Sequence, residues 1–190
     1  AAHYRCAGTL GRLGFSMISV IIPHMPFPEA DAALDECLAS LRGQYDELIL
    51  VINDGIGFGS ACNRGLRYAS GDFLFVVNND TVLTKGSLEE ICFMPGVTAP
   101  RVIGGGPGCF FCMPRWVYER VGGYDERFEI GYFEDDDLIR RLAEVGIPLS
   151  IVEEAVVEHQ HGGGLTMKQV GERENFERNQ AVFRDKWEEK

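Results

Sequence analysis

The 190-residue sequence lacks a long apolar run, and this absence limits what the protein can be. No stretch approaches the ~18 to 20 apolar residues that a membrane-spanning helix needs. The layout of a secretory signal is also missing, so we expect a cytoplasmic protein without a transmembrane segment. The patterns GxxxxGK[ST], GxSxG and HExxH are absent as well. Their absence argues against a phosphate-loop ATPase, a serine hydrolase of the nucleophile-elbow type and a zinc protease.

Basic residues are scarce in this sequence. Eighteen Lys and Arg stand against 29 Asp and Glu, which gives a formal net charge of −11. Such a chain repels a polyanion, so we expect no nucleic-acid partner. If a phosphorylated ligand binds, we expect a divalent cation to help hold it.

The six cysteines provide neither a zinc site nor a disulfide framework. They are scattered, and only Cys109 and Cys112 form a CxxC pair, without a second pair or a nearby His. Free cysteine is among the most buried residue types. We therefore expect reduced, packed thiols, as in an intracellular protein.

The sequence contains 45% hydrophobic residues, and its short apolar runs alternate with segments whose apolar residues have helical spacing. Apolar runs at 18–22, 48–52 and 72–77, the first stopped by Pro23, are each followed by residues at helical spacing. This alternation predicts an α/β fold with a mostly parallel central sheet and helices on both faces. We expect a single domain over residues 17–190. Residues 1–16 lack periodicity, and we interpret them as a leader or a poorly ordered tail outside the fold.

The second half of the chain is less regular. Residues 101–108, rich in glycine and proline, are expected to cross the top of the sheet. Helices are predicted over 114–121, ending at Gly122, and over 135–145. Residues 147–157 then provide one or two further strands.

The most informative segment is an apolar run that ends abruptly in polar residues. Within residues 71–81, a predicted strand runs directly into Asn78, Asn79 and Asp80. Open α/β sheets bind ligands at the carboxyl ends of their strands. Asp80 is a hard oxygen ligand, suited to Mg²⁺ or Mn²⁺ that also contacts phosphate oxygens. The alternative is a simple turn, which Asn-Asn-Asp-Thr also favours.

A second acidic cluster, Glu134-Asp135-Asp136-Asp137, opens a predicted helix. The helix dipole favours the ionised form of acids in the first turn. An ionised carboxylate can accept a proton from a hydroxyl as that oxygen attacks. Capping and dipole compensation are the alternative, but they require only one acid. We therefore interpret the cluster as a candidate proton acceptor.

Two histidines and three glycines are further candidates. His159 and His161 follow the last predicted strand, and either could ligate a metal through neutral imidazole. The alternative is an ordinary surface or core histidine. Gly55, Gly57 and Gly59 fit either a turn or a close backbone approach to a ligand.

Three segments together resemble glycosyltransferase family 2 enzymes of the GT-A fold, near the rhamnosyltransferase-like branch. Residues 71–81 resemble the family pattern of Gly-Asp, an apolar run and Asn-x-Asp-Thr. The most specific match is Gly-Gly-Tyr-Asp-Glu-Arg-Phe at 122–128, followed by Glu-Asp-Asp-Asp-Leu at 134–138. The tail resembles the family at Arg178-Asn179, Phe183 and Lys186-Trp187.

The resemblance implies an inverting, metal-dependent hexosyl- or deoxyhexosyltransferase. Such an enzyme moves a sugar from a nucleotide-diphosphate donor to a hydroxyl of a glycan, a lipid-linked intermediate or a protein. It implies Asp135 as catalytic base and Mn²⁺ or Mg²⁺ at Asp80, where His159 or His161 could also bind. The implied acceptor-binding residues are Glu134, Gly108 and Cys109, and the donor-binding residues are Pro23, Asp54, Asn63, Asn78, Asn79 and Asp80. The alternatives are an inactive nucleotide-sugar or glycan binding module of the same fold, and a nucleotidyltransferase.

Overall fold

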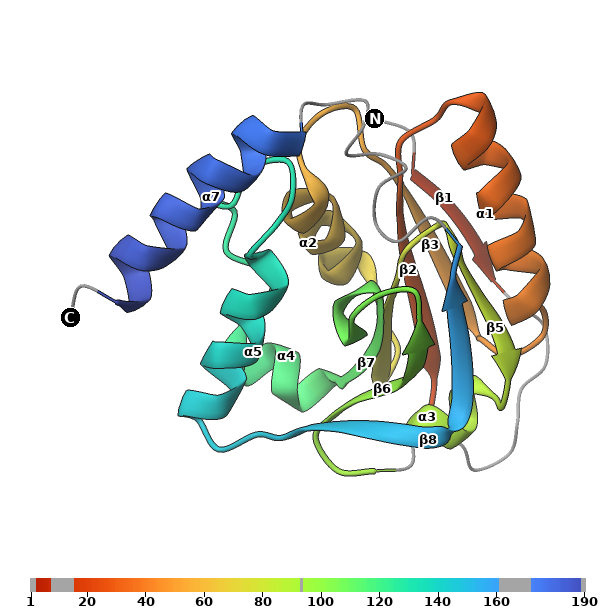
Figure 1. Cartoon of the computed structure of the whole chain (residues 1–190). Coiled ribbons are helices and arrows are strands. Elements are labelled where there is room, and N and C mark those ends of the chain that lie inside the picture. The colour runs from red at the N-terminus through yellow and green to blue at the C-terminus, as the bar shows by residue number, and fades with distance from the viewer. Residues whose placement is uncertain (1–2, 8–15, 93, 161–171, 189–190) are drawn as a thin grey trace.

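The centre of the protein is an eight-stranded sheet in the order β1-β3-β2-β4-β7-β6-β8-β5 (Figure 1). This computed structural model describes residues 3–7, 16–92, 94–160 and 172–188. The strands are β1 (His3–Ala7), β2 (Ile18–His24), β3 (Glu47–Ile52), β4 (Phe73–Val77), β5 (Thr81–Lys85), β6 (Val97–Ile103), β7 (Phe110–Pro114) and β8 (Leu149–His159). The helices are α1 (Pro28–Leu41), α2 (Phe58–Tyr68), α3 (Leu88–Cys92), α4 (Arg115–Val121), α5 (Glu134–Glu144) and α7 (Glu172–Trp187), with a short 3₁₀ helix η1 (Pro107–Cys109). Among these described helices, none is both long and apolar enough to cross a membrane.

Successive side chains of the central strands pack on opposite faces of the sheet. On β2, Val20 and Ile22 belong to the core shared with α1 and α3, whereas Ile21 belongs to the core shared with α2, α4 and α5. Figure 1 shows α1 on one side of the sheet and α2, α4, α5 and α7 on the other. Because both faces are covered, a central strand needs apolar residues at nearly every position. This explains the continuous apolar runs of the sequence.

The sheet is mixed rather than mostly parallel. β3, β2 and β4 run parallel, and so do β6 and β8, but β7 runs antiparallel to β4 and β6, and β5 runs antiparallel to β8. Only residues 78–80 separate β4 from β5 in the chain, yet β5 does not pair with β4 and lies beside β8 at the end of the strand order. The predicted α/β class with helices on both faces is confirmed, whereas the prediction of a mostly parallel sheet fails in the second half.

The start of the chain differs from two further expectations. His3–Ala7 forms edge strand β1, antiparallel to β3, so residues 1–16 are not all outside the fold. An edge strand joins a sheet through backbone bonds, and five residues show no clear side-chain pattern. β2 also continues through Pro23 to His24. Because β4 pairs only with Ile18–Ile21, no bond to β4 needs the N–H that Pro23 lacks.

One edge of the sheet collects several strand ends and positions the site. The parallel strands β2, β3 and β4 end there. Because β7 is antiparallel to β4, its start lies at the same edge, and the Asn78 N–H donates to the Cys109 carbonyl at 2.8 Å. His159, at the end of β8, pairs with Thr81 at the start of β5. Since β3 and β4 flank β2 on opposite sides, this edge is also the point where the strand order reverses, a usual place for a ligand.

Gly65 allows helix α2 to lie directly on the sheet. A Cβ at this position would overlap the Ile21 Cγ2 methyl and lie 3.1 Å from Val51 Cγ2. Replacing an exposed helical Gly by Ala stabilises a protein by about 1 kcal/mol, but overpacking a core costs about 1 to 3 kcal/mol.

We therefore expect Gly65→Ala to lower the melting temperature by several degrees, since 1 kcal/mol corresponds to about 2 to 4 °C at this size. Thermal unfolding followed by circular dichroism measures the change. Ser60→Ala, on the same helix and half-exposed, is the control and should not lower it. A Gly65→Ala protein that melts at or above the wild-type temperature would refute the packing account.

Candidate active site

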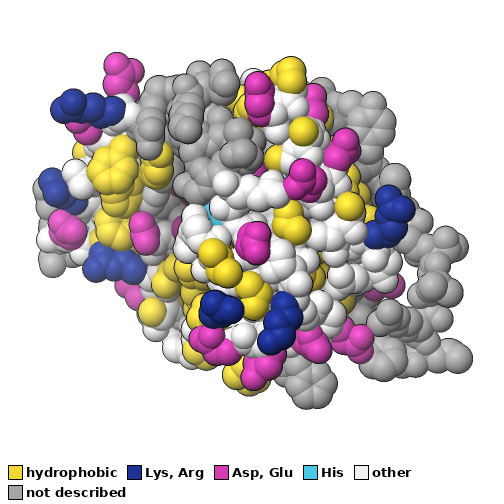
Figure 2. All heavy atoms as spheres, turned by 45° about the vertical axis from the view of Figure 1, so that its right-hand side comes forward, with side chains coloured by type: hydrophobic (Ala, Val, Ile, Leu, Met, Phe, Trp, Pro, Cys, Tyr) yellow, Lys and Arg dark blue, Asp and Glu magenta, His cyan; other side chains and the backbone are white. Residues whose placement is uncertain are grey.

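A cleft of about 380 Å³ opens at this edge of the sheet. Its volume falls within the range of small-molecule sites, about 300 to 1,000 Å³. The lining comes from the ends of β2, β3, β4 and β8, from residues 105–109 and from residues 130–136. Figure 2 shows a histidine as a small cyan area in a hollow of the surface. Folding thus brings Asp80 and Asp135, from separate acidic clusters, to one cleft.

The corner Asn78-Asn79-Asp80 is at once a turn and a wall of this cleft. The Asn78 carbonyl accepts bonds from the Thr81 N–H at 3.3 Å and from the Thr81 hydroxyl at 2.7 Å. Because the turn bonds at Asn78 use its backbone, the three side chains remain available to line the cleft. The Asn78 Oδ1 atom is buried without a hydrogen-bond partner among the described residues. The turn and ligand-site interpretations are therefore compatible.

Asp80 and His159 form a buried pair in the cleft. The Asp80 Oδ1 and His159 Nε2 atoms are 3.0 Å apart, and both side chains are at most 5% exposed. This separation is that of a hydrogen bond, and two side chains so close together could also both bind one divalent cation. The residues that the structure describes contain no group of three or more His, Cys, Asp or Glu that could hold a metal. His161 lies outside them.

Glu134 and Asp135 begin α5 and face the cleft with little hydrogen bonding. Glu134 Oε2 and Asp135 Oδ1 are buried without a partner among the described residues. Burial, and then the charge of Asp136, raises the pKa of Asp135 to about 7. Burial, and then the charge of Asp135, raises the pKa of Glu134 to about 8. Both carboxyl groups are thus poised to exchange protons near neutral pH.

The four consecutive acids have different roles because each helical residue turns by about 100°. Glu134, Asp135 and the exposed Asp136 line the cleft. Asp137 is fully buried elsewhere, where it accepts bonds from Arg141 Nε at 2.8 Å and Trp187 Nε1 at 2.9 Å and pairs with Lys186. Asp137 is therefore structural, whereas the three acids before it line the cleft.

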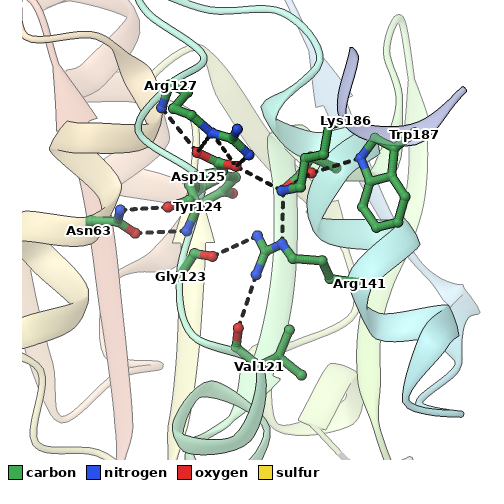
Figure 3. Close-up of polar contacts among 10 residues, drawn as sticks. Asn63, Val121, Gly123, Tyr124, Asp125, Arg127, Arg141, Lys186 and Trp187 are labelled. Atoms are coloured by element: carbon green, nitrogen blue, oxygen red, sulfur yellow. Dashed lines mark hydrogen bonds and ion pairs between the residues drawn. The ribbon is translucent and has the colours of Figure 1, made fainter. Parts of the chain in front are cut away.

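Helix α7 is joined to α5 and to residues 121–127 by polar contacts. In Figure 3, Lys186 and Trp187 of α7 lie beside Arg141 of α5. Lys186 Nζ is 2.7 Å from the Asp125 carboxylate, and the Arg141 guanidinium donates to the Gly123 carbonyl at 2.7 Å. Hydrogen bonds from Arg127, and then from Lys186, hold the pKa of Asp125 well below its usual range. Asp125 therefore stays ionised and its links persist over a wide pH range.

A second contact from α7 fixes the loop before α5. The Asn179 amide nitrogen donates to the carbonyls of Glu129 at 2.8 Å, Gly131 at 2.6 Å and Tyr132 at 3.1 Å. This loop contains non-glycine residues at positive φ, namely Ile130, Tyr132 and Phe133. Such backbone is costly and persists only where its surroundings enforce it. Asn179 supplies that constraint, and the loop in turn sets the start of α5.

Glycines at 105 and 108 let the cleft floor pass close to the functional side chains. A Cβ at Gly105 would lie 2.5 Å from His159 Nδ1, and one at Gly108 would overlap the Asp135 carboxylate. The floor therefore runs from His159, a candidate metal ligand, to Asp135, the candidate proton acceptor. Cys109, the next residue, also lines the cleft. Burial raises its thiol pKa to about 12, so it is a packing group rather than a nucleophile.

Not every predicted site residue reaches the cleft. Pro23 lines it, but Asp54 is exposed beside Arg64 at 3.9 Å. Asn63 is buried on α2, where its amide exchanges bonds of 2.9 and 2.8 Å with the Tyr124 backbone. Asn53, missed in the sequence, lines the cleft instead of Asp54, and its buried Oδ1 has no partner among the described residues. Its position as the first residue after β3 was the available signal.

Gly57 and the described cysteines have packing roles. Gly57, with φ of 90°, directly precedes α2, and a Cβ there would lie 2.7 Å from the Ile130 nitrogen. The glycine-rich segment thus permits close contact between α2 and the 129–133 loop. The cysteines with described side chains are free and buried: Cys37, Cys62, Cys92, Cys109 and Cys112.

Solved structures share this fold at low sequence identity. No protein-family model matches the sequence, and it has no significant match among curated proteins. Mannosyltransferase PcManGT from Pyrobaculum calidifontis, in complex with GDP-Man and Mn²⁺, is 13% identical with a TM-score of 0.57, over 77% of this chain and 57% of that one. The catalytic domain of Drosophila β1,4-galactosyltransferase 7, in complex with xylobiose, is 14% identical with a TM-score of 0.58, over 77% and 71%. GalNAc-T7, with UDP, GalNAc and Mn²⁺, is 13% identical with a TM-score of 0.58, over 76% and 43%.

These likenesses show the fold, which is the predicted GT-A arrangement in a single α/β domain. The chain spans 57% of the mannosyltransferase and 43% of GalNAc-T7. Their sugar donors and metals are therefore evidence about those proteins, and the activity of this chain has to be argued from its own residues.

The unpaired carboxylate of Asp135 predicts a pH-dependent cost to stability. Its pKa is about 7 in the folded protein against 3.8 as the ordinary value. The folded state therefore binds the extra proton, and stability falls as pH rises from about 4 to 7. An unsatisfied buried polar group costs about 1 to 3 kcal/mol.

At pH 8 we expect Asp135→Asn to melt at least about 2 °C above the wild type. This difference should shrink towards pH 4. Differential scanning fluorimetry across this range measures it. Asp35→Asn, at an exposed position of α1 away from the cleft, is the control and should show no rise. An Asp135→Asn effect that does not change with pH would contradict the assignment.

Proposed function

We propose that the protein is an inverting, metal-dependent glycosyltransferase that moves a hexosyl or deoxyhexosyl group from a nucleotide-diphosphate donor to an acceptor hydroxyl. The observation that carries the proposal is that one cleft contains both the Asp80–His159 pair and Asp135 with its raised pKa. The shared fold with nucleotide-sugar glycosyltransferases supports it. The motifs at 71–81 and 122–138 favour family 2 and its rhamnosyltransferase-like branch.

The charge of the cleft explains why a metal is part of the proposal. The described lining contains four carboxylates, Asp80, Glu134, Asp135 and Asp136, and no Lys or Arg. A diphosphate would be repelled by this wall unless a divalent cation accompanied it. Asp80 and His159 would hold that cation, which neutralises charge on the leaving diphosphate. An imidazole ligand suits Mn²⁺ better than Mg²⁺, which prefers oxygen ligands.

Asp135 is proposed to take the proton of the acceptor hydroxyl. That oxygen attacks the anomeric carbon, a new C–O bond forms, and the bond to the diphosphate oxygen breaks, so the single displacement inverts the configuration. A base with a pKa of about 7 matches the working pH well. Glu134, whose pKa of about 8 keeps it largely protonated at neutral pH, can donate a hydrogen bond to an acceptor oxygen.

A thermal-shift screen of nucleotide diphosphates and their sugars, with and without Mn²⁺, would identify the donor, because a ligand of the folded state raises the melting temperature. Transfer and hydrolysis assays with that donor then test the activity. Release of nucleoside diphosphate supports glycosyl transfer. Binding without turnover indicates a binding module. Release of pyrophosphate when a nucleoside triphosphate and a sugar phosphate are supplied instead indicates a nucleotidyltransferase.

Two variants should separate metal binding from proton transfer. We expect Asp135→Asn to lower kcat by about 10² to 10⁴-fold, the usual contribution of a general base, while calorimetry shows unchanged donor affinity. Asp80→Ala should instead weaken the Mn²⁺-dependent affinity for the nucleotide. Glu144→Gln, at the exposed end of α5, is the control and should alter neither quantity. Wild-type turnover by Asp135→Asn would remove this residue from the mechanism.

The glycine floor provides a test that leaves every polar side chain in place. Gly108→Ala should displace the Asp135 carboxylate and lower kcat at least tenfold, because small misplacements of reacting groups are costly. Gly106→Ala, where a Cβ would meet nothing within 4 Å, is the matched control. Steady-state kinetics on both variants, with melting curves to verify folding, compare the two. Equal rates would mean that Gly108 does not set the position of Asp135.

A further inference from the structure

A buried histidine connects the outside of helix α1 to the cleft. His24, at the end of β2, is 4% exposed. Its Nε2 atom is 2.9 Å from Asp31 Oδ1, and its Nδ1 atom is 2.9 Å from Asn79 Nδ2. Asn79 is buried and lines the cleft beside Asp80, whereas the Asp31 side chain is 56% exposed in the first turn of α1.

Hydrogen-bond donors and acceptors have a fixed order along this chain of groups. An ionised carboxylate can only accept, so the Nε2 atom facing Asp31 must carry the proton. In a neutral imidazole the other nitrogen is then an acceptor. The Nδ1 atom therefore requires a donor, which the Asn79 amide supplies through its nitrogen. The amide oxygen of Asn79 takes no part in this contact and remains available as an acceptor.

We propose that His24 is a positioning residue which, held by Asp31, fixes the Asn79 amide so that its oxygen faces a ligand in the cleft. An oxygen acceptor repels phosphate oxygens and selects a hydrogen-bond donor. Resting on the proposed function, the matching group is a hydroxyl of the nucleotide-sugar donor, because Asn79 is next to the candidate metal ligand Asp80. Asp31 and His24 thus determine which chemical group this wall recognises, although neither belongs to the motifs that suggested the function.

The ring nitrogen of His24 that carries the proton can be identified by NMR, without an activity assay. Two-bond ¹H–¹⁵N spectra of the full ¹⁵N-labelled chain, at about pH 8 where an ordinary imidazole is neutral, report which ring nitrogen is protonated. We expect the proton on Nε2. In Asp31→Asn the amide no longer enforces this tautomer, so a shift towards Nδ1 is expected. A wild-type proton on Nδ1 would overturn the proposal.

Kinetics test whether the amide orientation matters to the donor. Asp31→Asn should raise KM for the donor sugar nucleotide about two- to tenfold, the ratio for one lost hydrogen bond, with kcat nearly unchanged. Glu29→Gln removes an equal charge from the same exposed turn without contacting His24 and should leave KM unchanged. Equal KM values for the two variants would refute the role of Asp31.

A direct pair of substitutions at His24 completes the test. His24→Asn keeps an acceptor near the position of Nδ1 and should retain more donor affinity than His24→Leu, which has none. Equal affinities would count against the proposal. If the protein neither binds nor turns over any donor, the proposed function fails, whereas the tautomer found by NMR still decides whether Asp31 and His24 orient Asn79.

Discussion

The buried carboxylate of Asp137 is the interaction on which the geometry of the site depends. It joins Arg141 of its own helix to Lys186 and Trp187 of α7, and Arg141 in turn binds the 121–123 turn. A buried charge is tolerable only when it is paired and fully hydrogen-bonded. With α7 held in this way, the Asn179 amide reaches the strained loop that precedes α5. The position of Asp135, the proposed proton acceptor, is thus set by contacts outside the cleft.

Asp135 and Asp137, two acids separated by one residue on α5, differ in how well their carboxylates are paired. Asp137 has a cationic or N–H partner at each carboxylate oxygen. Asp135 has a buried oxygen without a partner among the described residues, and its pKa is correspondingly raised. The partners of Asp137 offset the cost of burying its charge, whereas the unpaired Asp135 destabilises the folded state when ionised. Such a local cost is the usual trade-off between stability and activity, and it agrees with the role proposed for Asp135.

The sequence predicted the α/β class, most helix positions and both acidic clusters of the cleft, because these depend on local periodicity and on residue types with distinctive chemistry. It did not predict that β7 runs antiparallel to β4 or that His3–Ala7 forms an outer strand beside β3. Strand pairing depends on contacts between residues remote in the chain. The structure places Asn53 rather than the predicted Asp54 in the cleft lining, a difference of one position at a strand end, where neighbouring side chains point in opposite directions. The connection from Asp31 to Asn79 crosses 48 residues and has no sequence signal.

The attachment of α7 has a consequence for the order in which the protein matures. Synthesis proceeds from the N-terminus, so the sheet and α5 leave the ribosome before the residues at 175–187 do. Until those residues arrive, the carboxylates of Asp137 and Asp125 lack Lys186, and the 129–132 carbonyls lack the Asn179 amide. The polar contacts that fix the start of α5 can therefore form only after the sheet and α5 itself have been synthesised.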